Sequence, residues 1–277
     1  MMPSRTTLAE KRRAFRALHL SGCFVIPNPW DAGSAGYLQS LGFKALASTS
    51  SGAAWSQGLP DNGLLRGQVI EHLRVMAAAT DLPLNADFED GFAADAAGVG
   101  ESVRLAVDTG IAGISIEDSI RGASLYPLDV AVERLRAARR AIDAAGGDVM
   151  LIGRAECFLV GKPDIELTVS RLKAYAEAGA DCLYAPGIKT VAHIRAVVEA
   201  VHPKPVNLLV GAPSDLSLAQ IADLGVRRVS VGGALARAAW AGFMNAARKI
   251  AEQGSFDGLT GAATHQAMNA LFEGRGS

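Results

Sequence analysis

Eight short apolar segments alternate with longer segments of helical pattern along almost the whole chain. Each apolar segment is a nearly continuous run of strand-forming residues, and several of the helical segments end in glycine, a common helix terminator. Alternation of this kind is typical of a parallel sheet that helices cover on its outer face. Strands are predicted at 23–29, 45–50, 83–89, 113–118, 149–156, 182–187, 205–210 and 228–234.

Eight strand–helix units without a long linker favour an α/β fold of one domain, a (β/α)8 TIM-type barrel over residues 1–277. An open, doubly wound sheet with eight strands is the alternative. The segment 236–277 contains two or more further helices, which is more than closing a barrel requires. It is therefore predicted to form a C-terminal helical extension that packs against another subunit.

The charge and cysteine content narrow the class of protein. The 27 Lys and Arg residues nearly balance the 28 Asp and Glu residues, so neither nucleic acid nor an anionic membrane is an expected partner. Three widely spaced cysteines indicate free thiols in a reducing compartment. The first twenty residues lack an apolar signal segment, and no apolar run approaches the roughly 20 residues that span a bilayer. A soluble cytoplasmic protein is expected.

Acidic residues gather where two of the predicted strands end. In "NADFEDGFA", residues 85–93, Asp87 and Glu89 project to the same side of the strand, and Glu117 ends the next strand. Because chemistry in such barrels lies at the carboxyl ends of the strands, these three carboxylates are expected to converge. Mutual repulsion would then require protonation or a cation.

The ligand chemistry favours a hard cation at this position. The set contains only oxygen donors and no histidine or cysteine, which suits Mg²⁺. The alternative is that acids after a strand cap the next helix or pair with a lysine on the surface, and Asp90 and Asp118 fit that description. Arg154, at the end of the fifth strand, is either a counter-ion for these acids or a bidentate clamp for a carboxylate or phosphonate.

Two glycine-containing segments have alternative interpretations. Ser50 and Ser51, in the segment 48–63, stand where backbone N–H groups at a helix start can bind an anion, or they belong to a flexible turn. "SVGGAL", residues 230–235, resembles a phosphate-binding turn, but close packing of strand against helix explains Gly232 and Gly233 equally well.

Taken together, these segments resemble the isocitrate lyase/phosphoenolpyruvate mutase superfamily over about residues 10–250. The resemblance lies in the order and spacing of "NPWDAGSAGYLQSLGFKALASTSSGAAWSQGLPD", "ADFEDGF", "GISIEDS", "IGRAECF" and "YAEAGADCLYAPG". It implies a barrel whose last helix is exchanged between the subunits of a homo-oligomer, a dimer or tetramer. It also implies Mg²⁺, with Mn²⁺ as a substitute, and a small 2-oxo or 2-hydroxy carboxylate whose C–C or P–C bond is cleaved or formed beside an enolate.

The same resemblance assigns roles to individual residues. Asp87 resembles the direct metal ligand, while Glu89, Asp61 and Glu117 resemble the acids that hold metal-bound water or complete the shell. The expected substrate contacts are Trp30, Ser50, Ser51, Asp61, Arg154 and Asn207. The expected catalytic residues are Arg154, Glu117, Tyr184 and Arg121.

The loop after the fourth strand differs from the lyases of this superfamily. Isocitrate and methylisocitrate lyases carry a K-x-C-G-H-type segment there, whereas "EDSIRGASLYPLD" contains no cysteine, lysine or histidine. The metal and carboxylate site that remains suits decarboxylation, retro-aldol cleavage or hydrolysis of an oxaloacetate-like acid. Two alternatives are a metal-independent isomerase or synthase that binds phosphate at "SVGG", and a barrel that binds a metabolite without catalysis.

Overall fold

Eight parallel strands form the central sheet at the positions predicted from the sequence. The computed structural model describes residues 6–273. The strands are β1 (Phe24–Ile26), β2 (Leu46–Ala47), β3 (Leu84–Asp87), β4 (Gly113–Glu117), β7 (Met150–Arg154), β8 (Cys182–Tyr184), β9 (Val206–Leu209) and β10 (Arg228–Ser230).

The sheet curls into a nearly closed barrel. Its hydrogen-bonded order is β1-β10-β9-β8-β7-β4-β3-β2, so every strand lies beside its neighbours in the chain. The ends of this series are joined by the N–H of Ala47, which donates to the carbonyl of Pro27 at 3.1 Å. This order confirms the predicted barrel and excludes the open sheet.

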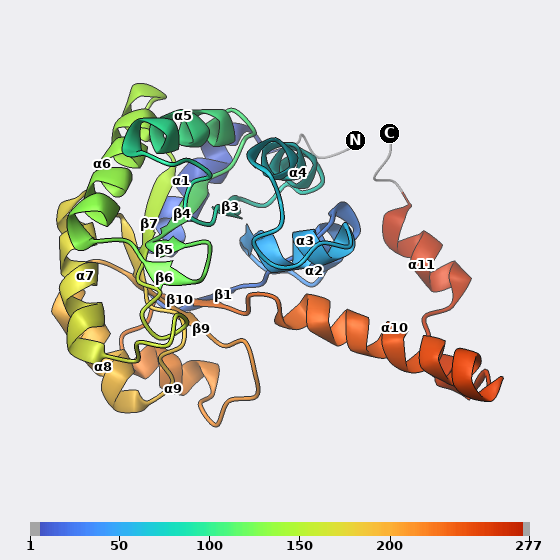
Figure 1. The fold of residues 1–277 in the computed structure, drawn as a ribbon. Coiled ribbons are helices and arrows are strands. Elements are labelled where there is room, and N and C mark those ends of the chain that lie inside the picture. The colour runs from blue at the N-terminus through green and yellow to red at the C-terminus, as the bar shows by residue number, and fades with distance from the viewer. Residues whose placement is uncertain (1–5, 274–277) are drawn as a thin grey trace.

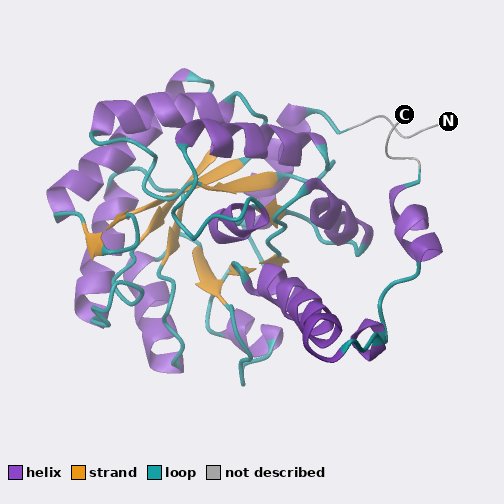
Figure 2. Cartoon of the chain, turned by 45° about the vertical axis from the view of Figure 1, so that its right-hand side comes forward, coloured by secondary structure: helices purple, strands orange, loops and turns teal. Residues whose placement is uncertain are grey.

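Helices surround the barrel, as Figures 1 and 2 show. They are α2 (Ala32–Ser40), α3 (Ser50–Ser56), α4 (Arg66–Ala78), α5 (Ala96–Val107), α6 (Leu128–Ala144), α7 (Ile165–Glu177), α8 (Val191–Val201) and α9 (Leu218–Asp223). α7 illustrates how the sequence forms them. Asp164 caps its first turn, and Thr168, Arg171, Leu172 and Tyr175 form one buried face at helical spacing.

Alternation along the strands separates two apolar cores. On β7, Met150 and Ile152 face the barrel interior, whereas Leu151 faces the surrounding helices. The interior is closed at the amino end by α1 (Leu8–Leu18), whose Phe15 is fully buried. A Cβ atom on Gly113 would lie 2.6 Å from the Phe15 ring, so glycine is required where this ring enters the barrel.

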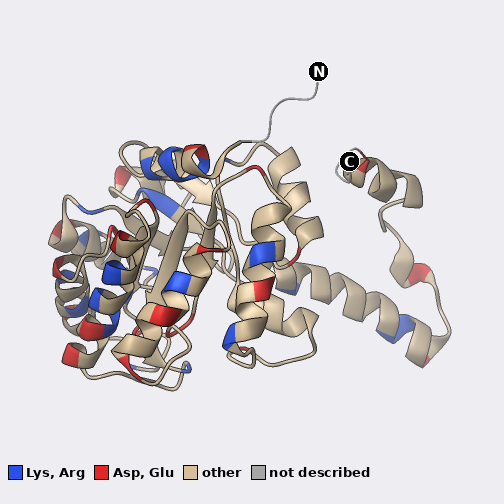
Figure 3. Ribbon diagram, turned by 90° about the horizontal axis from the view of Figure 1, so that it is seen from above, with Lys and Arg blue, Asp and Glu red and all other residues tan. Residues whose placement is uncertain are grey.

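The C-terminal extension leaves the barrel. α10 (Ala234–Gln253) projects outward and is followed by the 3-10 turn η1 (Asp257–Leu259) and by α11 (His265–Phe272), as Figure 1 shows. Within α10 only Ala236 is buried, and the segment 238–247 has no charged residue, so the projecting helix is largely uncharged in Figure 3. The additional C-terminal helices are confirmed through residue 273, and residues 274–277 lie outside the described part of the chain. Their packing against another subunit stays a prediction. None of the helices within residues 6–273 is long and apolar enough to cross a membrane.

Candidate active site

A cavity of about 380 Å³ opens at the carboxyl ends of the strands. Carboxyl, guanidinium, amide and hydroxyl groups dominate its lining. The charged side chains that line it are Asp61, Asp87, Glu89, Glu117, Glu156, Arg121, Arg154 and Arg228. Charged residues therefore converge at the edge of the barrel where the sequence places the chemistry.

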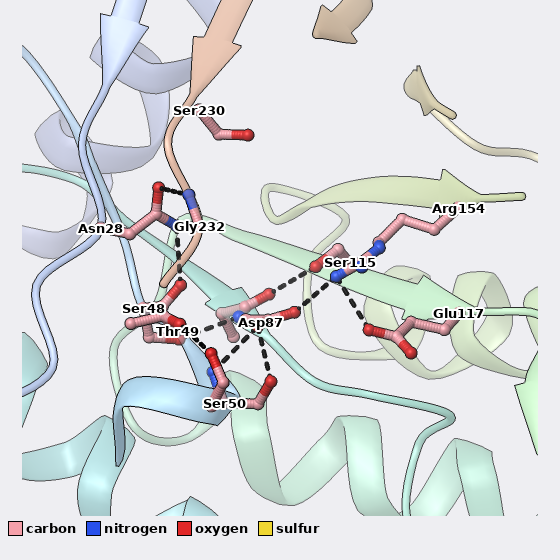
Figure 4. A network of polar contacts seen from close by, with 12 residues as sticks. Asn28, Ser48, Thr49, Ser50, Asp87, Ser115, Glu117, Arg154, Ser230 and Gly232 are labelled. Carbon is pink, nitrogen blue, oxygen red and sulfur yellow. Dashed lines mark hydrogen bonds and ion pairs between the residues drawn. The ribbon is translucent and has the colours of Figure 1, made fainter. Parts of the chain in front are cut away.

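Arg154, the last residue of β7, holds three of these acids together. Its Nη1 atom lies 2.8 Å from Oδ1 of Asp87 and 2.8 Å from Oε1 of Glu117, and its Nε atom donates to Glu156 at 2.8 Å. Figure 4 shows the first two contacts. The guanidinium also lies over the ring of Tyr184 on the neighbouring strand, 4.8 Å from the ring centroid. Arg154 is thus held in place on several sides while one face of the cavity stays open to a ligand.

Asp87 links β3 to the start of α3. Its Oδ2 atom accepts hydrogen bonds from the backbone N–H and the hydroxyl of Ser50, each at 2.9 Å. Its backbone N–H donates to the hydroxyl of Ser48 at 2.9 Å. The start of a short helix therefore holds this carboxylate in position next to Arg154.

Glu89 is the least satisfied acid of the site. Its Oε1 atom is buried without a hydrogen-bond partner, and its backbone adopts a φ of 43°, which is strained for a residue other than glycine. Burial, and then the charges of Asp87, Asp61 and Asp90, raise the pKa of Glu89 to about 8. Burial and Asp87 likewise raise the pKa of Asp61. An unpartnered carboxylate oxygen beside other acids is chemically suited to bind a cation or a water molecule.

The oxygen donors fit a hard divalent ion that is held largely through water. No histidine or cysteine lines the cavity. Within residues 6–273 no three His, Cys, Asp or Glu side chains are preassembled as a metal cluster, because Arg154 separates Asp87 from Glu117. Mg²⁺ commonly takes only one or two carboxylates directly and keeps several waters. The residues present are compatible with that mode.

Two acids near the cavity have structural roles instead. Asp118 accepts hydrogen bonds from Arg171, Tyr175 and the backbone N–H of Glu156. Asp90 accepts from the hydroxyl of Tyr126 at 2.9 Å and from the N–H of Phe92 at 3.0 Å. Both acids therefore have structural partners, but these are not the helix start or the surface lysine that the alternative interpretation named.

The glycine turn after β10 is occupied by its own neighbours. The N–H groups of Val231 and Gly232 both donate to Oδ1 of Asn28 at 2.9 Å, so they are not free for a phosphate. A Cβ atom on Gly233 would approach the hydroxyl of Ser51 to 2.8 Å. Close packing explains this turn, and the phosphate-binding interpretation loses its support.

A small hairpin covers one side of the cavity. It is formed by β5 (Ser119–Ile120) and β6 (Ser124–Leu125), which pair antiparallel. At its tip Arg121 adopts a φ of 48° and donates to the carbonyl of Asn62 at 2.7 Å. The β5–β6 hairpin, which lies in the connection between β4 and α6, thereby contacts the loop that carries Asp61.

Most of the predicted site residues line this one cavity, and two do not. Ser50, Ser51, Asp61, Asp87, Glu89, Glu117, Arg121, Arg154 and Tyr184 line it. Trp30 instead lines an apolar surface hollow with Trp240 and Phe243. Asn207 is fully buried in the barrel interior, where it contacts Arg228 and Ser230. The roles assigned to these residues stay predictions.

Sequence reasoning assigned no role to several polar residues of the lining, although it placed Glu156 at the end of the fifth strand. Glu156 and Arg228 are the charged ones, and Ser48, Ser115 and Ser230 are neutral. A signal for Arg228 was present, because an arginine inside an otherwise apolar strand segment, "RVSVGG", is unusual unless it has a polar environment.

Comparison with known proteins agrees with this geometry. The family model described as phosphoenolpyruvate phosphomutase matches residues 15–251. The chain belongs to this family. The oxaloacetate decarboxylase of Pseudomonas aeruginosa is 30% identical over 241 residues, which cover 83% of this chain and 82% of that protein. The 2-methylisocitrate lyase of Escherichia coli is 30% identical over 207 residues, which cover 70% of this chain and 68% of that protein.

Solved structures give the same assignment. A crystal structure from Burkholderia cenocepacia J2315, whose protein has a provisional lyase/mutase assignment, is 45% identical, covers 96% of both chains and has a TM-score of 0.91. The structure of 2,3-dimethylmalate lyase, a member of the phosphoenolpyruvate mutase/isocitrate lyase superfamily, is 26% identical with a TM-score of 0.83 and covers 98% of this chain and 96% of that one. The family predicted from the sequence is confirmed, and with it an enzyme of the lyase/mutase class.

Proposed function

We propose that this enzyme cleaves a C–C bond beside the carbonyl of a small 2-oxo or 2-hydroxy acid through an enolate, in a Mg²⁺-dependent reaction, with oxaloacetate as the first substrate to test. The observation that supports this proposal is the contact of one guanidinium, that of Arg154, with both Asp87 and Glu117, next to the unpartnered carboxylate of Glu89. The relationship to oxaloacetate decarboxylase supports the choice of substrate.

Arg154 and the start of α3 are proposed to bind the substrate carboxylate. A guanidinium presents parallel N–H donors that match a carboxylate. At the start of the helix the backbone N–H of Ser50 donates to Asp87, so the N–H of Ser51 is the donor proposed for the substrate. Held in this way, the substrate is oriented so that its scissile bond is perpendicular to the carbonyl plane.

Asp87 is proposed as the direct ligand of Mg²⁺, with Mn²⁺ as a substitute. Asp61, Glu89 and Glu117 would hold the ion through water, in keeping with the partly separate positions of the acids. When bound, the ion supplies a fixed positive charge that stabilises the negative charge that develops on the substrate oxygen.

Tyr184 and Arg121 are proposed to serve proton transfer and closure. Burial raises the pKa of Tyr184 to about 12, so its hydroxyl keeps its proton at neutral pH and can donate it. Arg121, at the tip of the β5–β6 hairpin, is proposed to keep the hairpin closed over the substrate through its bond to Asn62.

We further propose a cytoplasmic homo-oligomer that exchanges its C-terminal helices. Cys23, Cys157 and Cys182 are free thiols, which supports a reducing compartment. The apolar side chains of Trp240, Phe243 and Met244 on α10 are exposed in the single chain, as expected of a face that another subunit covers.

The test is turnover of oxaloacetate, phosphonopyruvate and 2-methylisocitrate, each with Mg²⁺ and with EDTA, followed by release of pyruvate, oxalate, phosphate or glyoxylate. We expect metal-dependent cleavage of at least one acid, and its loss in Asp87→Asn but not in the matched surface variant Asp108→Asn. Turnover that survives EDTA would contradict the metal proposal. Absence of turnover with all three acids would favour a barrel that only binds a metabolite.

A further inference from the structure

Arg228, the first residue of β10, carries a buried charge that no carboxylate neutralises. Its side chain is 2% exposed. Its Nε atom donates to Oδ1 of Asn207 at 2.8 Å and its Nη1 atom to Oδ1 of Asn85 at 3.4 Å, and both partners are neutral amides. Among the ion pairs of residues 6–273, none involves Arg228, whereas the buried Arg171 pairs with Asp118 at 2.9 Å.

The two amides are fixed so that they present oxygen to the guanidinium. The Nδ2 group of Asn207 donates to the hydroxyl of Ser230 at 2.9 Å, and that of Asn85 donates to the carbonyl of Ala86 at 3.0 Å. Each amide therefore has its nitrogen engaged elsewhere and its oxygen turned to Arg228. The arrangement orients the guanidinium and leaves its full charge in place.

Two other titratable groups that interact with the guanidinium, His19 and Cys182, do not neutralise its charge either. His19, which caps the end of α1, interacts with this charge, but its pKa is lowered to about 3 by burial and then by the charge of Arg228, so it is neutral. Cys182, on β8, is a buried thiol whose pKa is raised by burial. Burying an uncompensated charge is expensive, so such a charge calls for a partner that is absent from the chain itself.

The side chain reaches the floor of the active-site cavity. Arg228 lines that cavity together with Asn85, Ser115, Tyr184 and Ser230. The strand register connects it to the mouth, since Arg228 pairs with Asn207, Asn207 with Tyr184, and Tyr184 with Arg154. Its Nη2 group makes no hydrogen bond with any described residue and is not among the fully enclosed unpartnered atoms, so it is the part of the guanidinium that remains available to a ligand in the cavity.

We propose that Arg228 is a specificity residue that binds a second anionic group of the substrate, a carboxylate or a phosphonate, at the inner end of the cavity. The proposal rests on the lyase function proposed above and narrows it to acids with two anionic ends. One end lies at Arg154 and the start of α3, and the other meets Arg228 and the hydroxyls of Ser115 and Ser230.

This position also discriminates among reactions. A cation that binds a carboxylate stabilises the ground state in which that group is charged, and so opposes its loss as neutral CO₂. The group held by Arg228 is therefore one that the product retains. Cleavage between the two acid ends is favoured over loss of the inner carboxylate.

Equilibrium binding of unreactive acids tests the proposal without any turnover. The probes are succinate, its monoamide succinamate, which has the same shape and one charge less, and 3-phosphonopropionate, each titrated calorimetrically in the presence of Mg²⁺. We expect the wild-type protein to prefer a dianion to succinamate by about 10- to 100-fold, as for a charge-assisted hydrogen bond. Comparison of succinate with 3-phosphonopropionate shows whether the site favours a carboxylate or a phosphonate.

Two variants separate the role of the charge from folding. Arg228→Gln removes the charge, and Asn207→Asp keeps the arginine but gives it an internal counter-ion of nearly the same shape. Both are expected to bind succinate no better than succinamate, with succinamate affinity close to that of the wild-type protein. A wild-type protein without preference for dianions, or a preference that persists in both variants, would overturn the proposal. Either result is independent of whether oxaloacetate or the other acids turn over.

Discussion

Arg154 and Asp87, the last residues of β7 and β3, meet across the barrel mouth with 2.8 Å between Nη1 and Oδ1. The same nitrogen lies 2.8 Å from Glu117, so one guanidinium compensates two acids of a site that holds still more negative charge. This contact connects stability to function, because a ligand or metal ion that enters the site must share or replace it.

Replacing Arg154 tests that connection. In Arg154→Gln the acids lose their internal counter-ion and the substrate loses its clamp, so kcat/KM should fall by about 10³-fold. Added Mg²⁺ should raise the thermal midpoint of the variant more than that of the wild-type protein, because the cation then compensates the acids alone. The matched control is Arg136→Gln, an exposed arginine that pairs with Glu133 on α6. Equal Mg²⁺ responses in variant and wild type would contradict this account.

The raised pKa of Glu89 predicts how stability varies with pH. The folded value of about 8 lies above the ordinary 4.5, so the folded state binds this proton more tightly than the unfolded state. The stabilisation is fully present below pH 4.5 and is lost as the pH rises through 8. Relative to Glu89→Gln, the metal-free wild-type protein should lose on the order of 5 kcal/mol across this window, at about 1.4 kcal/mol per pH unit.

Chemical denaturation at several pH values measures this difference. Mg²⁺ should reduce it, because a cation favours the ionised carboxylate. If the two proteins keep the same stability difference from pH 5 to pH 8.5, Glu89 does not titrate as its environment indicates.

The hairpin contact between Arg121 and Asn62 predicts a kinetic effect without a stability effect. Arg121 is exposed, so Arg121→Ala should change the free energy of unfolding by no more than about 0.5 kcal/mol. Loss of the contact should open the hairpin and lower kcat/KM about tenfold. Arg121→Lys, which keeps the charge and a donor, should recover part of the activity. A variant that is destabilised but fully active would assign Arg121 a structural role instead.

The barrel could be predicted from the sequence because apolar residues follow a different spacing in its strands than in its helices. Each strand of the central sheet lies inside its predicted range, since a strand covered on the outside and packed on the inside must be apolar along its length. The acids of β3 and β4 were assigned to the mouth for the same reason, because Asp87 and Glu117 follow the apolar run directly.

Other features depend on tertiary geometry that one sequence does not encode locally. The two strands of the β5–β6 hairpin are too short to show a regular spacing of apolar residues, so the segment was treated only as a loop. Asn207 was expected to touch the substrate, but its depth depends on the stagger of the strands around the barrel, which places it against Arg228. Arg228 itself was overlooked because strand alternation gives a side chain two possible faces, and only neighbouring strands decide which face is the interior.

The projecting helix α10 leads to a prediction about assembly. Phe243 is 62% exposed and packs edge-to-face on Trp240, with ring centroids 5.4 Å apart. In an isolated chain, Phe243→Ser would remove only exposed surface and change stability by about 0.5 kcal/mol at most. If another subunit covers this face, the same substitution removes a buried aromatic contact and should dissociate the oligomer. Light scattering coupled to size-exclusion chromatography distinguishes the two cases, with Arg248→Ser on the same helix as the matched control.

The thermal midpoint of the wild-type protein should also rise with protein concentration, as it does when folding is linked to association. A wild-type protein that stays monomeric at every concentration would show that α10 does not mediate self-association.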